Sequence, residues 1–223
     1  TYTDRAAEAV DPGEYRGTTR SFDDDCWSME RQAETVNLMA DIHKPIIAQV
    51  HGNCLAGGTD LALACDMVIA ADNARIGFPA TRANGSPPAH MWFYHVGPQW
   101  AKRLLLSGDS LTGRDAAKIG LVMDAVPAEQ LEAEVGELAR RLSFVDADLL
   151  AANKRIVNLG LELSGSRTLQ RLAVENDSRA HQSQGPRRAQ FKADMEAVGL
   201  KEALKRRDEP FGDGMIRLHA RGD

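Results

Sequence analysis

Two adjacent glycines, Gly57 and Gly58, stand between an apolar β-branched run and a short helical run. The first backbone N–H groups of a helix have no partner within it, and the helix dipole adds partial positive charge there. A glycine at this place lets a reacting molecule approach the N–H group without a Cβ in the way. The turn therefore suits the stabilisation of an enolate oxygen. A structural alternative, in which the glycines only let strand and helix pack closely, stays open.

An acidic side chain, Asp60, follows the two glycines within the first helical turn and is a candidate general base or water-positioning group. The same carboxylate would also stabilise the helix dipole by roughly a few tenths of a kcal/mol, which is an equally good reason for its presence. Arg82, His90 and His95 lie in or just after a later loop, and a histidine can exchange a proton near neutral pH. Because His90 stands beside the apolar residues 91–93, packing on an apolar helix is the favoured interpretation for it.

Composition excludes several other classes of function. Of the 223 residues, 43% are hydrophobic and 26% are charged, so a sizeable core can form. The formal net charge of −5 argues against a nucleic-acid binder. Three cysteines without a CxxC pair, and no pair of histidines spaced with a carboxylate, predict no disulfide framework and no metal site. A reducing, cytoplasmic location fits this cysteine usage. The most apolar stretch, residues 61–71, is too short to span a membrane.

Strand and helix patterns alternate through the first half of the chain, which predicts an α/β fold. Residues 1–25 are polar and loop-like, and residues 1–126 are expected to form the core domain. Strands are expected at 46–51, 67–71, 74–78 and 121–126, and helices at 23–42, 59–65, 98–106 and 112–119.

After Pro127 the pattern is helical throughout. Leu131, Val135, Leu138 and Leu142 share one helical face, and further helices are expected at 147–163, 166–182 and 187–206. Residues 127–223 are therefore predicted to form a helical C-terminal region. Since this region is amphipathic and no strand follows it, we expect it to lack a sheet to pack on and to contact another subunit.

Three ordered blocks of the sequence resemble the crotonase (enoyl-CoA hydratase/isomerase) superfamily. The run HKPIIAQVHGNCLAGGTDLALACDMVIAADNARIGFP, residues 43–79, is similar to the central block of that family nearly position by position. AKRLLLSGDSLTGRDAAKIGLVMDAV, residues 101–126, resembles the next block, and LKRRDEPFGD, residues 204–213, resembles the closing motif. The resemblance covers most of residues 43–213.

The resemblance implies a spiral of ββα turns, a helical trimerisation region, and trimers or hexamers that bind acyl-coenzyme A. Coenzyme A enters as part of the substrate, and no covalently bound cofactor is implied. By position, Gly57 supplies one of two oxyanion N–H groups, and the other comes in the family from an earlier Ala-Gly-x-Asp loop. That loop is missing from this sequence, which begins at Thr1, so we expect an upstream segment. The substrate contacts expected from the resemblance are Leu55, Gly58, Pro79, Ala80, His90 and Lys205.

The sequence departs from the hydratase pattern at two positions. Hydratases of the family have one glutamate in the first turn after the glycine pair and a second after the later proline; here these positions hold Asp60 and Ala80. Asp60 is shorter by one methylene, and Ala80 carries no acid. Hydration or isomerisation of a 2-enoyl-CoA is therefore the nominal prediction. A crotonase-fold hydrolase or decarboxylase, a non-catalytic acyl-CoA binder, and an enzyme for free carbonyl compounds stay open.

Overall fold

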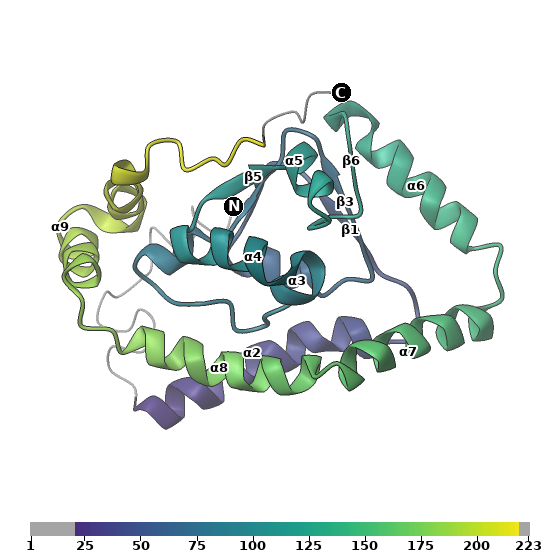
Figure 1. The fold of residues 1–223 in the computed structure, drawn as a ribbon, viewed down its shortest axis with the longest axis horizontal. Coiled ribbons are helices and arrows are strands. Elements are labelled where there is room, and N and C mark those ends of the chain that lie inside the picture. Colours follow the sequence, from purple (N-terminus) through teal and green to yellow (C-terminus); the bar gives the residue numbers. More distant parts are fainter. Residues whose placement is uncertain (1–20, 219–223) are drawn as a thin grey trace.

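The computed structural model describes residues 21–218 and confirms the predicted α/β class, with two small sheets set among long helices (Figure 1). The strands are β1 (Ile47–Val50), β2 (Asn53–Leu55), β3 (Met67–Ala71), β4 (Arg75–Gly77), β5 (Ser110–Thr112) and β6 (Asp124–Val126). The α-helices are α2 (Phe22–Asp41), α3 (Gly57–Leu63), α4 (Trp92–Ser107), α5 (Gly113–Lys118), α6 (Leu131–Leu142), α7 (Ala147–Leu163), α8 (Ser166–His181) and α9 (Pro186–Asp208). Three 3-10 turns are η1 (Pro79–Arg82), η2 (Ala128–Gln130) and η3 (Glu209–Phe211).

Each sheet has three strands, and the chain passes from one sheet to the other between β1 and β2 and again between β3 and β4. In the first sheet β3 lies between β1 and β6, and both pairs are parallel. In the second sheet β4 lies between β2, which is parallel to it, and β5, which is antiparallel. Alternation of this kind stacks the two sheets, so that short strands can share one core.

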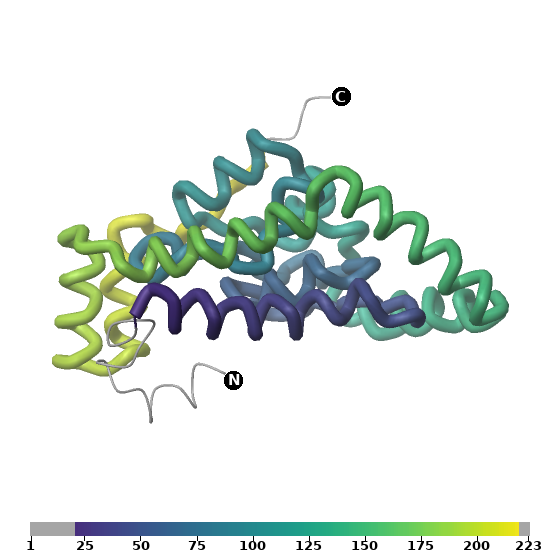
Figure 2. The backbone as a smooth tube through the Cα atoms, turned by 90° about the horizontal axis from the view of Figure 1, so that it is seen from below, coloured from purple at the N-terminus to yellow at the C-terminus, as the bar shows by residue number. Residues whose placement is uncertain are grey.

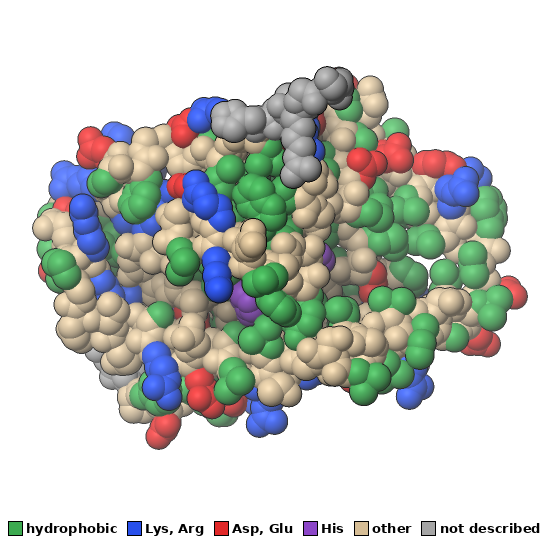
Figure 3. All heavy atoms as spheres, in the orientation of Figure 1, with side chains coloured by type: hydrophobic (Ala, Val, Ile, Leu, Met, Phe, Trp, Pro, Cys, Tyr) green, Lys and Arg blue, Asp and Glu red, His purple; other side chains and the backbone are tan. Residues whose placement is uncertain are grey.

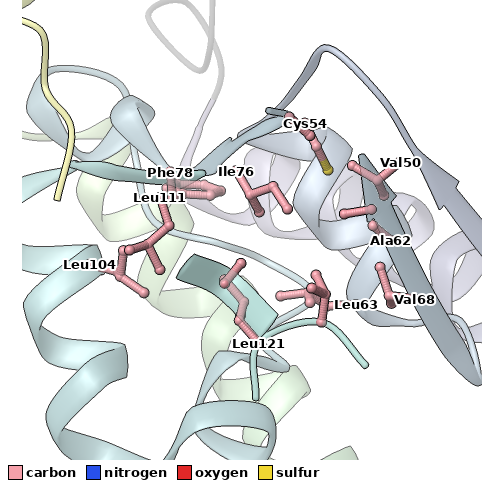
Figure 4. Packing of buried hydrophobic residues seen from close by; sticks show 14 of the residues in the cluster. Val50, Cys54, Ala62, Leu63, Val68, Ile76, Phe78, Leu104, Leu111 and Leu121 are labelled. Carbon is pink, nitrogen blue, oxygen red and sulfur yellow. The ribbon is translucent and has the colours of Figure 1, made fainter. Parts of the chain in front are cut away.

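The main hydrophobic core lies between the two sheets and the helices that follow them. Figure 4 shows Val50 and Val68 of the first sheet, Ile76 and Leu111 of the second, and Leu63 of α3 around a common interior. All five are at most 7% exposed. Burial of a side chain of this size contributes about 1.5–3 kcal/mol, so these contacts fix the position of α3 against both sheets.

Part of the helical C-terminal region covers the first sheet. Helix α6 contacts β1 and β3, with Leu131 buried and Val135 and Leu138 packed against the main core. The expectation that this region lacks a sheet to pack on is therefore wrong for α6, and its apolar face is the reason. Helix α8 runs alongside α2 (Figure 2), and α9 contacts η1 and η3. Helix α7 contains no buried residue.

The end of α2 is held by side chains from α7 rather than by its own last turn, which contains no basic residue. The Lys154 ammonium, with a side chain only 6% exposed, donates to the Met39 carbonyl at 2.8 Å and pairs with Asp66 at 2.8 Å. Asn158 donates to the Ala40 carbonyl at 2.8 Å. These contacts satisfy carbonyls that a helix end leaves without partners. They also tie α7 to the segment that enters β1.

The boundaries of several elements differ from those predicted from the sequence. Strands β2 and β5 were not predicted, because each has only three residues and β2 follows a glycine. The strand expected at 121–126 is confined to β6. The helix expected to begin at Pro98 begins at Trp92 instead, and it is kinked at Gly97, where φ is 69° and ψ is 177°.

At the amino-terminal end, α2 begins at Phe22, where a loop was expected up to about residue 25. Ser21 caps this helix, since its hydroxyl accepts a hydrogen bond from the Asp24 N–H at 3.1 Å. The expectation of a loop at residues 1–20 lies outside the described residues.

Candidate active site

The two segments singled out by the sequence leave the second sheet at the same edge. Strands β2 and β4 are parallel and in register, with Leu55 opposite Gly77. Directly after Leu55, the Ala56 N–H donates to the Gly77 carbonyl at 3.1 Å. Helix α3 begins one residue beyond this bond, and η1 begins with Pro79, two residues beyond Gly77. The structure thus brings the glycine turn and the Pro79–Ala80 segment together.

Ala56 has a strained backbone immediately before the glycine pair. Its φ of 49° and ψ of −121° make it the one non-glycine residue with positive φ among residues 21–218. Such a conformation costs on the order of 1–3 kcal/mol and persists only where neighbours enforce it. Here the Ala56 N–H is bonded to Gly77, and the Ala56 carbonyl accepts from the Thr59 N–H at 2.8 Å and the Thr59 hydroxyl at 2.6 Å. The strain fixes the peptide whose N–H belongs to Gly57.

The space around Gly57 decides between the two interpretations of the glycine pair, as an oxyanion site or as a means for strand and helix to pack closely. A Cβ placed on Gly57 would have no described atom within 4 Å, and one on Gly58 would meet only the Cys54 sulfur at 3.8 Å. Close packing of strand and helix therefore does not require glycine at either position. The N–H of Gly57 is the first of α3 and has no carbonyl within that helix to bond. The arrangement leaves a donor and open space for an approaching oxygen.

Asp60 is a buried carboxylate, only 6% exposed, in the first turn of α3. Burial and then the negative charge of Asp60 raise the pKa of the Cys54 thiol to about 11, with a smaller contribution from Cys65. An exposed carboxylate would stabilise the helix dipole as well without the cost of desolvation. Burial thus favours a role for Asp60 beyond helix stabilisation. It also supports the interpretation of Cys54 as a buried apolar residue.

Ala80 lies in η1 with 5% exposure and packs in the main core. Its carbonyl gathers three N–H groups, from Ala83 at 3.2 Å, Asn84 at 2.7 Å and Gly85 at 3.2 Å. This carbonyl organises the tight turn that leads into the loop of residues 83–91. The position itself offers neither an acid nor a base.

Arg82, one of the candidates to replace the missing acid, is a structural residue. Its side chain is 2% exposed and pairs with Asp109 at 2.9 Å and with Asp208 at 3.1 Å. It also donates to the Ser107 carbonyl at 3.0 Å and lies 3.9 Å from the centre of the Phe211 ring. A guanidinium held this way joins η1 to α4 and α9 and is not available for acid–base chemistry.

The two candidate histidines occupy different places. His90 precedes α4 and is not on a helix, which corrects the expectation of an apolar helix at this residue. His95 is in α4, and its Nε2 lies 3.0 Å from the carbonyl of Leu63, at the end of α3 away from Gly57. At 1.5 Å per residue that end is about 9 Å along the axis from the glycine. Burial lowers the pKa of both histidines, so both are neutral at pH 7.

Lys205 lies far from the glycine turn of the same chain. It is on α9, at one end of the molecule in Figure 1, whereas α3 lies near the centre. Its side chain is 77% exposed and 3.6 Å from Glu202. Its neighbour Arg206 pairs with Asp194 of the same helix at 3.0 Å.

Sequence reasoning missed Ala56 and Thr59 as parts of the site. Thr59 is fully buried, and its hydroxyl bonds the Ala56 carbonyl. A threonine three residues after a turn residue is a known signal for such a local bond, whereas the strain at Ala56 leaves no signal in residue type.

Among residues 21–218, no three His, Cys, Asp or Glu side chains gather as metal ligands. Within the same range, no helix is both long and apolar enough to cross a bilayer.

Comparison with known proteins places these observations in one family. The family described as Enoyl-CoA hydratase/isomerase matches residues 13–201. The chain is 35% identical over 129 residues to a probable mitochondrial enoyl-CoA hydratase of Dictyostelium discoideum, covering 56% of this chain and 47% of that protein. It is 34% identical over 144 residues to the crotonyl-CoA hydratase of Syntrophomonas wolfei, covering 63% and 54%. The chain thus spans about half the length of the curated relatives it matches.

Solved structures show the same relationship. An enoyl-CoA hydratase from Mycobacterium smegmatis superposes with a TM-score of 0.83 at 35% identity, covering 95% of this chain and 70% of that one. An enoyl-CoA hydratase/isomerase from Xanthobacter autotrophicus Py2 gives 0.76 at 34% identity, covering 82% and 69%. The expected resemblance is confirmed, and the chain belongs to the enoyl-CoA hydratase/isomerase family of the crotonase superfamily.

Proposed function

We propose that this protein acts on acyl-coenzyme A thioesters and hydrates or isomerises a 2-enoyl-CoA through a thioester enolate. The observation that carries the proposal is the Gly57 N–H, which starts a helix, belongs to a residue with open space where a Cβ would lie, and follows the strained backbone of Ala56. Coenzyme A takes part only as a portion of the substrate, and the reaction needs no further cofactor. The relatives named as hydratases support the substrate class.

In this proposal the Gly57 N–H donates to the thioester oxygen as negative charge develops on it. One such preorganised donor is worth about 10²–10³-fold in rate. Asp60 then serves as the base. For isomerisation of a 3-enoyl-CoA it removes a proton from the carbon next to the thioester, and the electron pair of that C–H bond moves toward the thioester oxygen to leave a dienolate. The same carboxylic acid returns the proton two carbons further along the chain, so one group completes the reaction.

Hydration makes a greater demand on the site. A water oxygen bonds to the β-carbon, one water proton goes to a base, and the α-carbon of the enolate takes up a proton. Without an acid at Ala80, Asp60 must perform both transfers. It is shorter than glutamate by about 1.5 Å, and a displacement near 1 Å can cost roughly a hundredfold. We therefore expect isomerisation to be faster than hydration.

The test uses the purified full-length protein and a panel of 2-enoyl- and 3-enoyl-CoA substrates. A 3-enoyl-CoA deuterated at the carbon next to the thioester should yield a 2-enoyl product with part of the abstracted deuterium on the carbon two positions further along the chain, because buried Asp60 exchanges slowly with water. Asp60→Asn should lower kcat by at least about a hundredfold. Turnover unchanged by Asp60→Asn would refute the role of this residue, and no turnover of any substrate would refute the proposed reaction.

Gly57→Ala tests the open space, with Gly136→Ala in α6 as the matched control. Both changes replace a helical glycine whose Cβ would meet no described atom within 4 Å, so both should stabilise the fold by about 0.5–1 kcal/mol. Only the methyl at Gly57 should obstruct the thioester and raise KM. Equal kinetics for the two variants would show that the substrate does not approach Gly57.

A second candidate function is acyl-CoA binding without catalysis. The observation in its favour is the buried Ala80, which removes one acid from the site. Calorimetric binding of an acyl-CoA without turnover would support this alternative over the enzyme. A hydrolase or decarboxylase that uses the same enolate would instead release free coenzyme A or carbon dioxide in the panel.

The proposed assembly is a homotrimer or a hexamer formed by two trimers. Large hydrophobic side chains are exposed along α7 and at its ends, including Phe144 (73%), Ile156 (64%), Val157 (65%) and Leu163 (89%). Figure 3 shows hydrophobic side chains gathered over α6 and α7 on one side of the molecule. Contiguous apolar surface of this kind commonly marks a protein interface. Sedimentation of the protein and of Leu163→Lys would test the assembly, and a monomeric wild type would refute it.

A cytoplasmic location is part of the same proposal. It is supported by the three cysteines, all of which are free thiols, as in proteins kept in a reducing compartment. Detection of the native protein in a sealed organelle fraction would contradict it.

A further inference from the structure

Three ionisable side chains are buried between α2, α8 and the loop of residues 83–91, away from the glycine turn. Asp177 of α8 is fully buried, and its Oδ1 accepts a hydrogen bond from the Ser86 N–H at 2.7 Å. The same oxygen lies 3.5 Å from Nε2 of His181, whose Nδ1 lies 2.7 Å from an oxygen of Asp25 in α2. Asp25 and His181 are each 2% exposed. The loop is thus connected to both helices through buried side chains.

Two more side chains hold the backbone of the same loop. Arg188 of α9, 6% exposed, donates from one guanidinium nitrogen to the carbonyls of Ala83 at 2.8 Å and Asn84 at 2.9 Å. Asn176 of α8 donates to the Ser86 hydroxyl at 3.0 Å. Helices α8 and α9, which belong to the helical C-terminal region, therefore both hold the loop, α9 at residues 83 and 84 and α8 at residue 86.

Gly85 shows how closely the loop fits against this cluster. A Cβ at Gly85 would lie 2.2 Å from Oδ1 of Asp177 and 3.0 Å from Nε2 of His181, so no side chain is accommodated there. The loop also begins at the three N–H groups gathered by the Ala80 carbonyl. A shift of Ser86 away from Asp177 is thereby transmitted through three residues to the segment that lies beside the glycine turn.

The stability of the fold does not require ionisable side chains between α2, α8 and the loop. Burial of carboxylates and a guanidinium is costly, and apolar residues of similar volume often stabilise as well or better. Here the charges are directed at backbone polar groups of one loop, where they select one conformation. We propose that Asp177 is a positioning residue, which holds the Ser86 backbone so that Pro79 and Ala80 form a fixed wall of the acyl-CoA site. This inference rests on the proposed function.

The experiment compares Asp177→Leu, Asp177→Asn and a control, Ser178→Ala. Leucine has the same branching and the same number of side-chain heavy atoms but no acceptor, whereas asparagine keeps an oxygen for the Ser86 N–H. Ser178 is equally buried in α8, and none of the hydrogen bonds described within residues 21–218 joins it to the loop, so its variant reports general damage to the helix. Hydrogen–deuterium exchange of a peptide that spans residues 83–91 is measured first, because it needs no substrate.

Asp177→Leu should exchange about 10- to 100-fold faster than wild type at the Ser86 amide, as expected for loss of a hydrogen bond to a charged acceptor. In steady-state kinetics with an acyl-CoA that the wild type turns over, it should lower kcat/KM by about 10- to 100-fold. Asp177→Asn should restore both values to within about threefold, and Ser178→Ala should change neither. Retained exchange behaviour across residues outside the loop will show that each variant is folded.

Two results would overturn the inference. Unchanged loop exchange in Asp177→Leu would show that Asp177 does not hold the loop. Faster loop exchange with kinetics equal to those of Ser178→Ala would show that the loop is held but does not position the site. Failure of the proposed function has a different signature, since the wild type would then turn over no acyl-CoA, and the exchange data alone would decide whether Asp177 holds the loop.

Discussion

The strained backbone of Ala56 leads to a prediction of unusual sign. Ala56→Gly should stabilise the protein, although a change from alanine to glycine normally destabilises. Glycine adopts positive φ without steric cost, so the substitution should relieve a strain on the order of 1–3 kcal/mol at φ 49° and ψ −121°. The bonds from the Ala56 N–H to Gly77 and from Thr59 to the Ala56 carbonyl use backbone atoms of residue 56, so they remain in the variant.

Two smaller effects oppose the relief of strain. Glycine makes the unfolded chain more flexible, which costs about 0.4–1 kcal/mol. The Ala56 methyl is half-buried against the main core, and its loss costs about half of the ~0.8 kcal/mol for a buried methylene. The balance is a gain of about 1 kcal/mol, which corresponds to a rise in Tm of about 2–4 °C for a chain of this size.

Urea unfolding of Ala56→Gly and of a matched variant, Ala133→Gly, measures this balance. Ala133 is exposed in helix α6, where the same chemical change should cost about 1 kcal/mol. The two variants should therefore differ by about 2 kcal/mol in the free energy of unfolding. If Ala56→Gly destabilises as much as Ala133→Gly, the strain at Ala56 is absent and the account of how the Gly57 N–H is fixed is wrong.

Three further measurements test the buried groups. Iodoacetamide labelling at pH 8, followed by mass spectrometry, should find Cys54 modified last of the cysteines, because a pKa of about 11 leaves about one thousandth of its thiol as thiolate. Asp60→Asn should lower the pKa of Cys54 and speed its labelling. Burial lowers the pKa of His95, so below about pH 6.5 the unfolded state binds more protons and stability falls as pH drops. Chemical unfolding of His95→Gln should therefore show a smaller loss of stability between pH 7 and pH 5 than the wild type. Lys154→Met should lose about 2–4 kcal/mol in urea unfolding, because it leaves Asp66 without its ammonium; a loss below ~1 kcal/mol would contradict the contacts described for α7.

Long periodic elements and residues with backbone constraints were predictable from the sequence. Helix α7 coincides with the predicted range 147–163, and the Ser21 cap marks α2 within one residue. The short strands β2 and β5 were not predictable, since their three residues carry too little pattern and form only because neighbouring strands pair with them. Helix α2 shows the limit of periodicity, because Trp27, a large apolar side chain within it, is 63% exposed.

The site was predictable as far as local sequence determines it. Gly57 and Asp60 lie within one turn of one helix, so their relation follows from helical geometry alone. Their proximity to Pro79 depends on the parallel pairing of β2 with β4, which the sequence did not reveal. Arg82 was a candidate catalytic group because it lies in the loop that follows Ala80. Its partner Asp208 is distant in sequence, and only the fold brings the two together.

The environment of Ala80 bears on which reaction this site can support. Ala80 packs in the main core, and its carbonyl is fully used by three N–H groups. A carboxylate introduced there would either be buried at a cost of several kcal/mol or would force η1 away from the core. The position is therefore built for a small apolar side chain, and the absence of an acid is integral to the local packing. With Asp60 as the one buried carboxylate in the first turn of α3, the geometry favours reactions in which a single group moves a proton between two carbons. The enolate that we propose is held by Gly57 would meet that requirement with the residues described, whereas fast water addition would need a second proton-transfer group that Ala80 does not supply.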